Sequence, residues 1–185
     1  MQPPEESRGK DIFLWRSGDW SFSKRFSSKA TWMTMLERLP TRDRLISWGM
    51  CVPAACPLCS LANESHDHLF FNCVFSTAVW SHYTGWMFAA ASASPAAVLA
   101  ILDQPHISSC SGVAVILKLL LQVIVYNLWT ERNQRIFRQS SSSEAAIISK
   151  VDRSIKDRLL SLPPLREGSI SFLLLYLTSR SLFPP

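Results

Sequence analysis

Apolar residues recur every three or four positions over much of the chain, which predicts a mainly α-helical protein. In the first such stripe, which leads up to a proline, the apolar residues are Trp32, Met35, Leu36 and Leu39. In the second they are Val79, Trp80, Tyr83, Trp86 and Met87. In the third, which Pro163 and Pro164 end, they are Ile147, Ile148, Val151, Ile155, Leu159 and Leu160. Each stripe can pack one face of a helix against a core.

A short helix is predicted directly after Pro40. Thr41 can cap its first N–H groups, and Gly49 suits the left-handed conformation that commonly ends a helix. The side chains of this helix that we expect to face the core are Leu45, Ile46 and Trp48.

The segment at 1–26 follows a different period. Trp20 and Phe22 alternate with serines, as in a strand with one buried face. A Ser-Gly-Asp turn at 17–19 precedes them and separates two short strand-like runs. This part of the chain is therefore predicted to form a short N-terminal β-hairpin.

The most apolar run covers residues 112–129 and has about the length that a bilayer crossing requires. Lys118 lies inside it, and Gln122 follows one helical turn later. A central Lys costs roughly 2.5–3.5 kcal/mol on membrane-insertion scales. Two polar residues four apart instead form a stripe that faces water or a partner. We therefore favour an amphipathic, buried or partner-facing helix, with membrane association through residues 112–129 as the alternative.

Composition and charge narrow the function classes. Hydrophobic residues make up 48% of the 185 positions and charged residues 18%, as in a chain with a folded core. The net charge of +5 permits contact with nucleic acid without requiring it. The sequence has no glycine-rich phosphate loop, and its fourteen acidic residues include no Asp-Asp pair of the kind that holds two metal ions in polymerases. We predict a non-enzymatic protein without a small-molecule substrate.

The cysteines point to a metal rather than to disulfides. The N-terminus lacks the basic start and apolar run of a secretory signal, so an intracellular location, nuclear or cytoplasmic, is expected. An odd count of five Cys then argues against a disulfide framework. Four residues have the spacing of a closed zinc shell, C-x2-C followed by H-x4-C: Cys56, Cys59, His68 and Cys73. Three thiolates and an imidazole favour a structural Zn²⁺ with no open position for water.

Two alternatives to this zinc site remain open from spacing alone. The thiols can be ordinary buried side chains, or the C-x2-C pair can be redox-active, although a redox pair requires neither His68 nor Cys73. Within the zinc interpretation His66 competes for the third position, and the tighter interval to Cys73 favours His68.

Several separated motifs carry a family resemblance. They are R-L-P-T-R-D-R-L-I-S-W-G at residues 38–49, then C-P-L-C, E-S-x-x-H-L-F-F-N-C and F-S-x-A-V-W. In this order they resemble the reverse transcriptase zinc-binding domain of plant non-LTR (LINE-type) retrotransposon polyproteins, over about residues 11–88. The later W-T-E-R-N-Q-R-I-F, residues 129–137, is similar to the segment that commonly follows this domain. The resemblance implies that Cys56, Cys59, His68 and Cys73 are the metal ligands, and the Ala-rich insertion suggests a domesticated or truncated element.

Together these features predict a small zinc-stapled helical domain with a short N-terminal β-hairpin and a C-terminal helical extension. The expected segments are a polar and aromatic segment at 1–26, the zinc-binding domain at 27–88, an Ala/Ser/Pro linker at 89–107, the helical extension at 108–164 and a tail at 165–185.

RNA or single-stranded DNA is the partner that this resemblance implies. Basic residues near aromatic ones can neutralise phosphates while bases stack. The candidates are Arg16, Lys24, Arg25, Lys29, Arg38, Arg42 and Arg44. Trp32 and Trp48 have helical spacing and are interpreted as core residues, and Arg42 and Arg44 are expected on the outer face of the helix after Pro40. The alternative is a structural or protein-interaction remnant of a retroelement that binds no nucleic acid.

Overall fold

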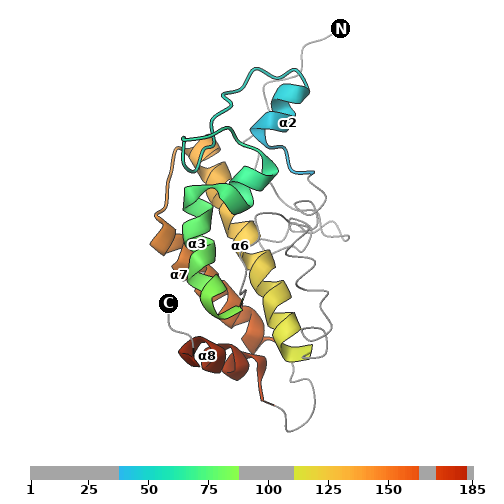
Figure 1. The fold of residues 1–185 in the computed structure, drawn as a ribbon, viewed down its shortest axis with the longest axis vertical. Coiled ribbons are helices and arrows are strands. Elements are labelled where there is room, and N and C mark those ends of the chain that lie inside the picture. Colours follow the sequence, from blue (N-terminus) through green and yellow to red (C-terminus); the bar gives the residue numbers. More distant parts are fainter. Residues whose placement is uncertain (1–37, 88–110, 163–169, 183–185) are drawn as a thin grey trace, which may run out of the picture.

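The computed structural model describes residues 38–87, 111–162 and 170–182. These parts of the chain are mainly helical and contain no sheet, only one isolated antiparallel bridge between Ala55 and Asn63. The elements are α2 (Arg42–Ser47), the π-helical turn η1 (His68–Asn72), α3 (Val74–Met87), α6 (Ser111–Arg138), α7 (Glu144–Leu160) and α8 (Phe172–Leu182), as Figure 1 shows.

Some of the sequence predictions concern parts of the chain outside the described residues. These are the N-terminal hairpin, the helix with Trp32 in its stripe, the linker at 89–107 and the basic residues Arg16, Lys24, Arg25 and Lys29.

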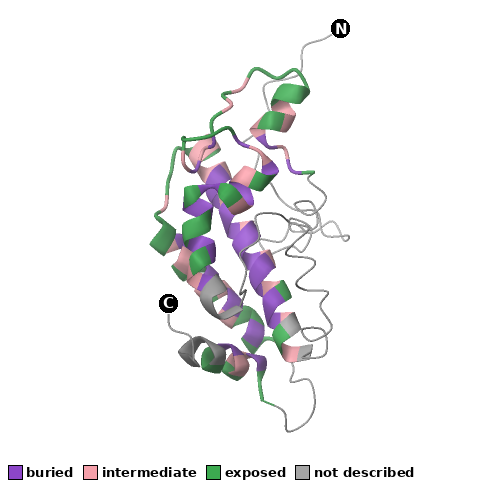
Figure 2. Cartoon of the chain, in the orientation of Figure 1, coloured by how far each residue is buried: buried purple, intermediate pink, exposed green. Residues whose placement is uncertain are grey.

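Helix α6 is the centre of the molecule. It packs against α3, α7 and α8, while α2 lies at the opposite end of the molecule from α8 (Figure 1). Buried residues run along most of its length (Figure 2). They include Ile116, Leu117, Leu120, Ile124 and Leu128. The apolar run at residues 112–129 therefore lies in α6 and supplies much of the helical core.

The polar positions of that run lie at the margin of the core. Lys118 is exposed and Gln122 is half-buried, as the amphipathic interpretation predicts. None of the helices in the described parts of the chain combines the length and the apolarity needed to cross a membrane.

Helix α7 confirms most of the predicted stripe. Its buried side chains recur every four residues, at Ile147, Val151, Ile155 and Leu159. The Ser143 side chain caps its start by accepting the Ala146 N–H at 3.3 Å. Ile148 is half-buried. Leu160 is exposed, contrary to expectation, because it follows Leu159 by one position and points about 100° away from it.

Residues of the expected tail form helix α8. Phe172 and Tyr176, one turn apart, are its buried residues. The Tyr176 hydroxyl donates to Asp152 Oδ1 on α7 at 3.0 Å. This segment is thus part of the bundle, which its sequence did not lead us to expect.

Helix α2 confirms one part of its prediction and contradicts another. Gly49 has φ +82° and ends the helix in the left-handed region. However, α2 has no buried residue. Leu45 is half-buried, whereas Ile46 is 43% exposed and the C-cap residue Trp48 57% exposed, so the expected inward orientation of Ile46 and Trp48 is wrong. A helix of only six residues at the end of the molecule has little core to cover. Thr41 makes no side-chain cap, and its Oγ1 instead lies 3.4 Å from His66 Nδ1.

Candidate metal centre

The C-x2-C pair lies on a tight turn. The Cys56 N–H donates to Ala62 O at 2.7 Å, and the Ser60 N–H donates to Cys56 O at 2.8 Å. Ser60 reverses the chain with φ +58°, and the Leu61 N–H points at Cys59 Sγ from 3.5 Å. Such a turn presents two sulfurs on one side while a backbone amide stabilises sulfur charge.

The π-helical turn η1 brings the second pair of donors together. His68 and Cys73 are five positions apart, and in an α-helix this separation would rotate them by about 140° relative to each other. In η1 the Cys73 N–H instead donates to His68 O at 2.7 Å, the i to i+5 bond of a π-helix. Trp80 of α3 fixes the turn, since its Nε1 donates to Phe70 O at 2.6 Å. The wider turn therefore accounts for how an H-x4-C spacing can serve one site.

The structure gathers Cys56, Cys59, His68 and Cys73 into one cluster. Their donor atoms all lie within 4.8 Å of one another. The two buried sulfurs, of Cys56 and Cys73, are 3.9 Å apart, and Cys59 Sγ is 3.3 Å from His68 Nε2. A tetrahedron with Zn–S bonds of about 2.3 Å separates two sulfurs by about 3.8 Å. The donor set and its spacing therefore fit a closed Cys3His zinc shell.

One sulfur of the cluster is held ready as a thiolate. The hydrogen bond from the Cys56 thiol lowers the pKa of Cys73 to about 5, with help from the Ser76 and Phe75 N–H groups at the start of α3 and against the opposing effect of burial. The same hydrogen bond, together with burial, raises the pKa of the Cys56 thiol. Since the thiolate is the form that binds a metal, this pair is poised to exchange its shared proton for a cation.

His66, the rival ligand, is placed elsewhere. It is buried, and its Nε2 accepts the Leu39 N–H at 3.2 Å. With Nε2 as acceptor, the proton of a neutral ring is assigned to Nδ1, which lies 3.4 Å from Thr41 Oγ1. Both ring nitrogens therefore contact the entry to α2, and His68 is the histidine that accompanies the thiols.

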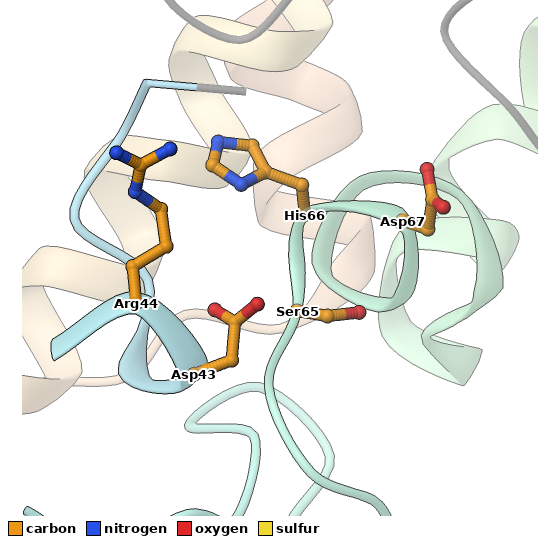
Figure 3. A pocket seen from close by; sticks show the side chains of 5 residues that line it. All are labelled: Asp43, Arg44, Ser65, His66 and Asp67. Atoms are coloured by element: carbon orange, nitrogen blue, oxygen red, sulfur yellow. The ribbon is translucent and has the colours of Figure 1, made fainter. Parts of the chain in front are cut away.

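A polar cavity of about 210 Å³ borders His66 (Figure 3). It is lined by Asp43, Arg44, Ser65, His66 and Asp67. Although Ser, His and Asp are the residue types of a hydrolytic triad, the His66 nitrogens are engaged as described above, and Ser65 Oγ accepts the His68 N–H at 3.1 Å. The cavity thus shows no paired nucleophile and base.

A buried ion pair joins the cysteine-bearing segment to α6. Arg132 Nε and Nη2 donate to the two carboxylate oxygens of Glu64 at 2.8 and 2.9 Å. Neither side chain is more than 3% exposed. The Arg42 N–H adds a third bond to Glu64 at 2.8 Å, and the Arg132 guanidinium lies 4.7 Å from the Trp129 ring centroid. The sequence analysis did not predict this pair, because its two residues are 68 positions apart.

The predicted nucleic-acid residues have different surroundings. Arg38 is exposed. Arg42 is half-buried and its guanidinium donates to the Ala55 carbonyl, so its expected place on the outer face of the helix is wrong. Arg44, also half-buried, holds its guanidinium 5.2 Å from the centroid of the exposed Trp48 ring.

Comparison with known families agrees with the cluster. Residues 8–80 match the family described as zinc-binding in reverse transcriptase, and this range includes all four clustered residues. No curated protein and no solved structure matches the chain. The chain therefore carries, within residues 8–80, a reverse transcriptase zinc-binding domain.

Proposed function

We propose that this chain is a non-catalytic module from a plant non-LTR (LINE-type) reverse transcriptase and that the module binds unpaired RNA or DNA. In this proposal a structural Zn²⁺ is held by Cys56, Cys59, His68 and Cys73. The single observation behind the proposal is the Cys3His cluster inside the family match. A Zn²⁺ bound there would contribute to the free energy of folding. It would have a structural rather than a catalytic role, because four protein ligands leave no position for a reacting water.

The absence of catalysis is supported by the arrangement of acidic groups. Among the described residues, the Cys3His cluster is the only group of three or more Cys, His, Asp or Glu side chains arranged to hold a metal ion. Polymerase and nuclease chemistry commonly relies on carboxylates that converge on two metal ions. Template-dependent nucleotide incorporation by rigorously purified protein would contradict this part of the proposal.

The surface that we assign to nucleic acid is centred on Trp48. This residue is 57% exposed, its ring lies beside the Arg44 guanidinium, and Arg38, which is nearby in the sequence, is exposed. An exposed indole offers a face on which an unpaired base can stack, and arginines neutralise the adjoining phosphates. Arg42 is left out of this surface because its guanidinium donates to the Ala55 carbonyl.

The test is a fluorescence titration with a single-stranded RNA oligonucleotide at several salt concentrations. Trp48→Ala should weaken binding by roughly 5- to 150-fold, the equivalent of about 1–3 kcal/mol for one stacked base, with little change in the salt slope. Arg38→Gln with Arg44→Gln should instead make the slope shallower, by about 0.7 for each phosphate that is no longer neutralised.

Phe137→Ala provides the control, because this aromatic is 64% exposed and belongs to α6 rather than to α2. Equal affinities of wild type, Trp48→Ala and Phe137→Ala at matched zinc content would show that Trp48 is not a stacking site. No binding by the zinc-loaded wild type would favour the alternative, a structural or protein-interaction remnant.

A further inference from the structure

One arginine of α6 reaches the turn between the first two cysteines. Arg135 Nη1 donates to Leu58 O at 2.6 Å and to Pro57 O at 3.3 Å. Pro57 and Leu58 are the two residues that separate Cys56 from Cys59. A single guanidinium group from a distant part of the chain therefore bonds the backbone of the C-x2-C turn.

The guanidinium is itself held from three other directions. Its Nε donates to Glu131 Oε1 at 2.8 Å, and its Nη2 donates to Ser142 O at 3.1 Å. Its Cζ lies 4.6 Å from the centroid of the Phe75 ring, two residues after Cys73. With so many contacts, Arg135 has little freedom to leave the turn.

The partner carboxylate remains charged in this buried place. Burial alone would raise the pKa of Glu131, but hydrogen bonds from the Ser142 N–H and from Arg135 outweigh it and hold the pKa below its usual range. The Ser142 N–H lies 2.7 Å from the same Oε1 that accepts Arg135. Arg135 and Glu131 thus form a rigid ion pair that presents its donor groups to the turn.

We propose that Arg135 is a positioning residue of the metal centre, one that shapes the Cys56–Cys59 turn before the ion binds and raises the affinity for it. This rests on the zinc site proposed above. Three thiolates, one neutral imidazole and one Zn²⁺ carry a net charge of −1. The guanidinium fixes the backbone of the turn, and because its own charge is paired with Glu131, the fixed backbone is the larger part of its proposed role. Arg135 lies beyond the matched residues 8–80, so part of the metal centre belongs to the helical extension.

The experiment measures Zn²⁺ affinity by competition with a chromophoric chelator and records the absorption spectrum of the Co²⁺-loaded protein. Arg135→Gln should weaken Zn²⁺ binding by roughly 10- to 100-fold, as loss of groups that orient ligands usually does. Arg135→Lys, which keeps the charge but not the fork, should recover part of the loss. In the metal-free protein, amide exchange of Arg135→Gln should rise at residues 56–61 first.

Two control variants separate this role from general stability. Arg138→Gln, an exposed residue in the last turn of the same helix, should leave the affinity unchanged. Arg132, on the same helix, donates to Glu64 and to Pro40 O rather than to the Cys56–Cys59 turn. Arg132→Gln should therefore lower the free energy of unfolding but weaken Zn²⁺ binding less than Arg135→Gln does. Equal affinity losses in Arg132→Gln and Arg135→Gln would overturn the proposal. A wild type that binds neither Zn²⁺ nor Co²⁺ would overturn the metal site itself, and the role of Arg135 with it.

Discussion

The Cys3His cluster and the Glu64–Arg132 ion pair differ in burial and in the partners on which they depend: the ion pair is buried on both sides, whereas Cys59 and His68 of the cluster are half-buried. The cluster draws its four donors from one short segment, between Cys56 and Cys73, and the proposed cation would have to come from outside the polypeptide. The ion pair joins residues 68 positions apart and is neutral by itself. Under the proposed function, local order around the cysteines depends on an external ion, whereas attachment of that segment to α6 does not. The two should fail separately.

The largest effect should come from breaking the cluster. Cys59→Ser should abolish stoichiometric Zn²⁺ binding and loosen residues 50–80, because structural zinc contributes about 10–16 kcal/mol in small zinc-finger peptides. Native mass spectrometry measures the metal, and hydrogen exchange measures the loosening. Cys51→Ser is the matched control, since Cys51 is exposed and outside the cluster. Equal zinc content in wild type and Cys59→Ser would refute the assignment.

Breaking the Glu64–Arg132 ion pair should lower the free energy of unfolding by less than loss of the metal does, and it should weaken the attachment of the cysteine-bearing segment to α6. Arg132→Met leaves the buried Glu64 charge without its main partner, and such losses typically cost about 3–5 kcal/mol. Urea unfolding measures the cost, and zinc stoichiometry should stay the same. Lys156→Met removes an ion pair with Asp152 that is 38% exposed on the lysine side, and it should cost less than about 1 kcal/mol. Equal free energies of unfolding for Arg132→Met and Lys156→Met would contradict the larger contribution assigned to the buried pair.

A gradual effect is expected from pH in the metal-free protein. The folded-state pKa of Cys73, about 5, lies below the ordinary thiol value of 9.0, so between these values the unfolded chain binds more protons than the folded one. Stability should therefore rise from pH 5 toward pH 8 and be lost as the pH falls through about 5. Thermal unfolding of the metal-free wild type measures this slope, and Cys73→Ala should flatten it. An unchanged slope in Cys73→Ala would exclude this thiol as its source.

The smallest effect sharpens the comparison by sparing both features. The Tyr83 hydroxyl donates to Ile148 O at 3.0 Å and so links α3 to α7. Tyr83→Phe should lower the free energy of unfolding by about 1 kcal/mol, the usual value of one hydrogen bond. Its Zn²⁺ affinity should equal that of wild type, and a weaker affinity would mean that the bundle and the cluster are coupled more tightly than their contacts indicate.

The candidate site was predictable because its determinants are local. A C-x2-C turn and an H-x4-C interval limit where four donors can lie, and the structure gathers those four residues. The four-residue period of α7 and the glycine that ends α2 are likewise properties of short stretches. The π-helical turn was not foreseen, although the five-residue interval between His68 and Cys73 requires a departure from the α-helix if both are to face one point.

The misses concern residues whose surroundings come from distant parts of the chain. The spacing of Trp48 predicts a core residue, but its side chain is exposed because α2 contributes no buried residue to the core. Arg132 and Arg135 received no role in the sequence analysis, because a sequence pattern does not show that they pair with Glu64 and with the backbone of the Cys56–Cys59 turn. Long-range pairing of this kind is set by the packing of the whole bundle.

The separation along the chain between the cluster and Arg132 has a consequence for biosynthesis. Cys73, the last donor of the cluster, is synthesised well before Arg132. At about 5–20 residues per second, the stretch between these two positions takes roughly 3–12 seconds to make. During this interval all four cysteine and histidine donors already exist, while Glu64 still lacks its counter-charge. A nascent chain can therefore bring its four proposed donors together before α6 is complete, and the proposed gain in metal affinity would follow only when Arg135 of the finished helix docks on the Cys56–Cys59 turn.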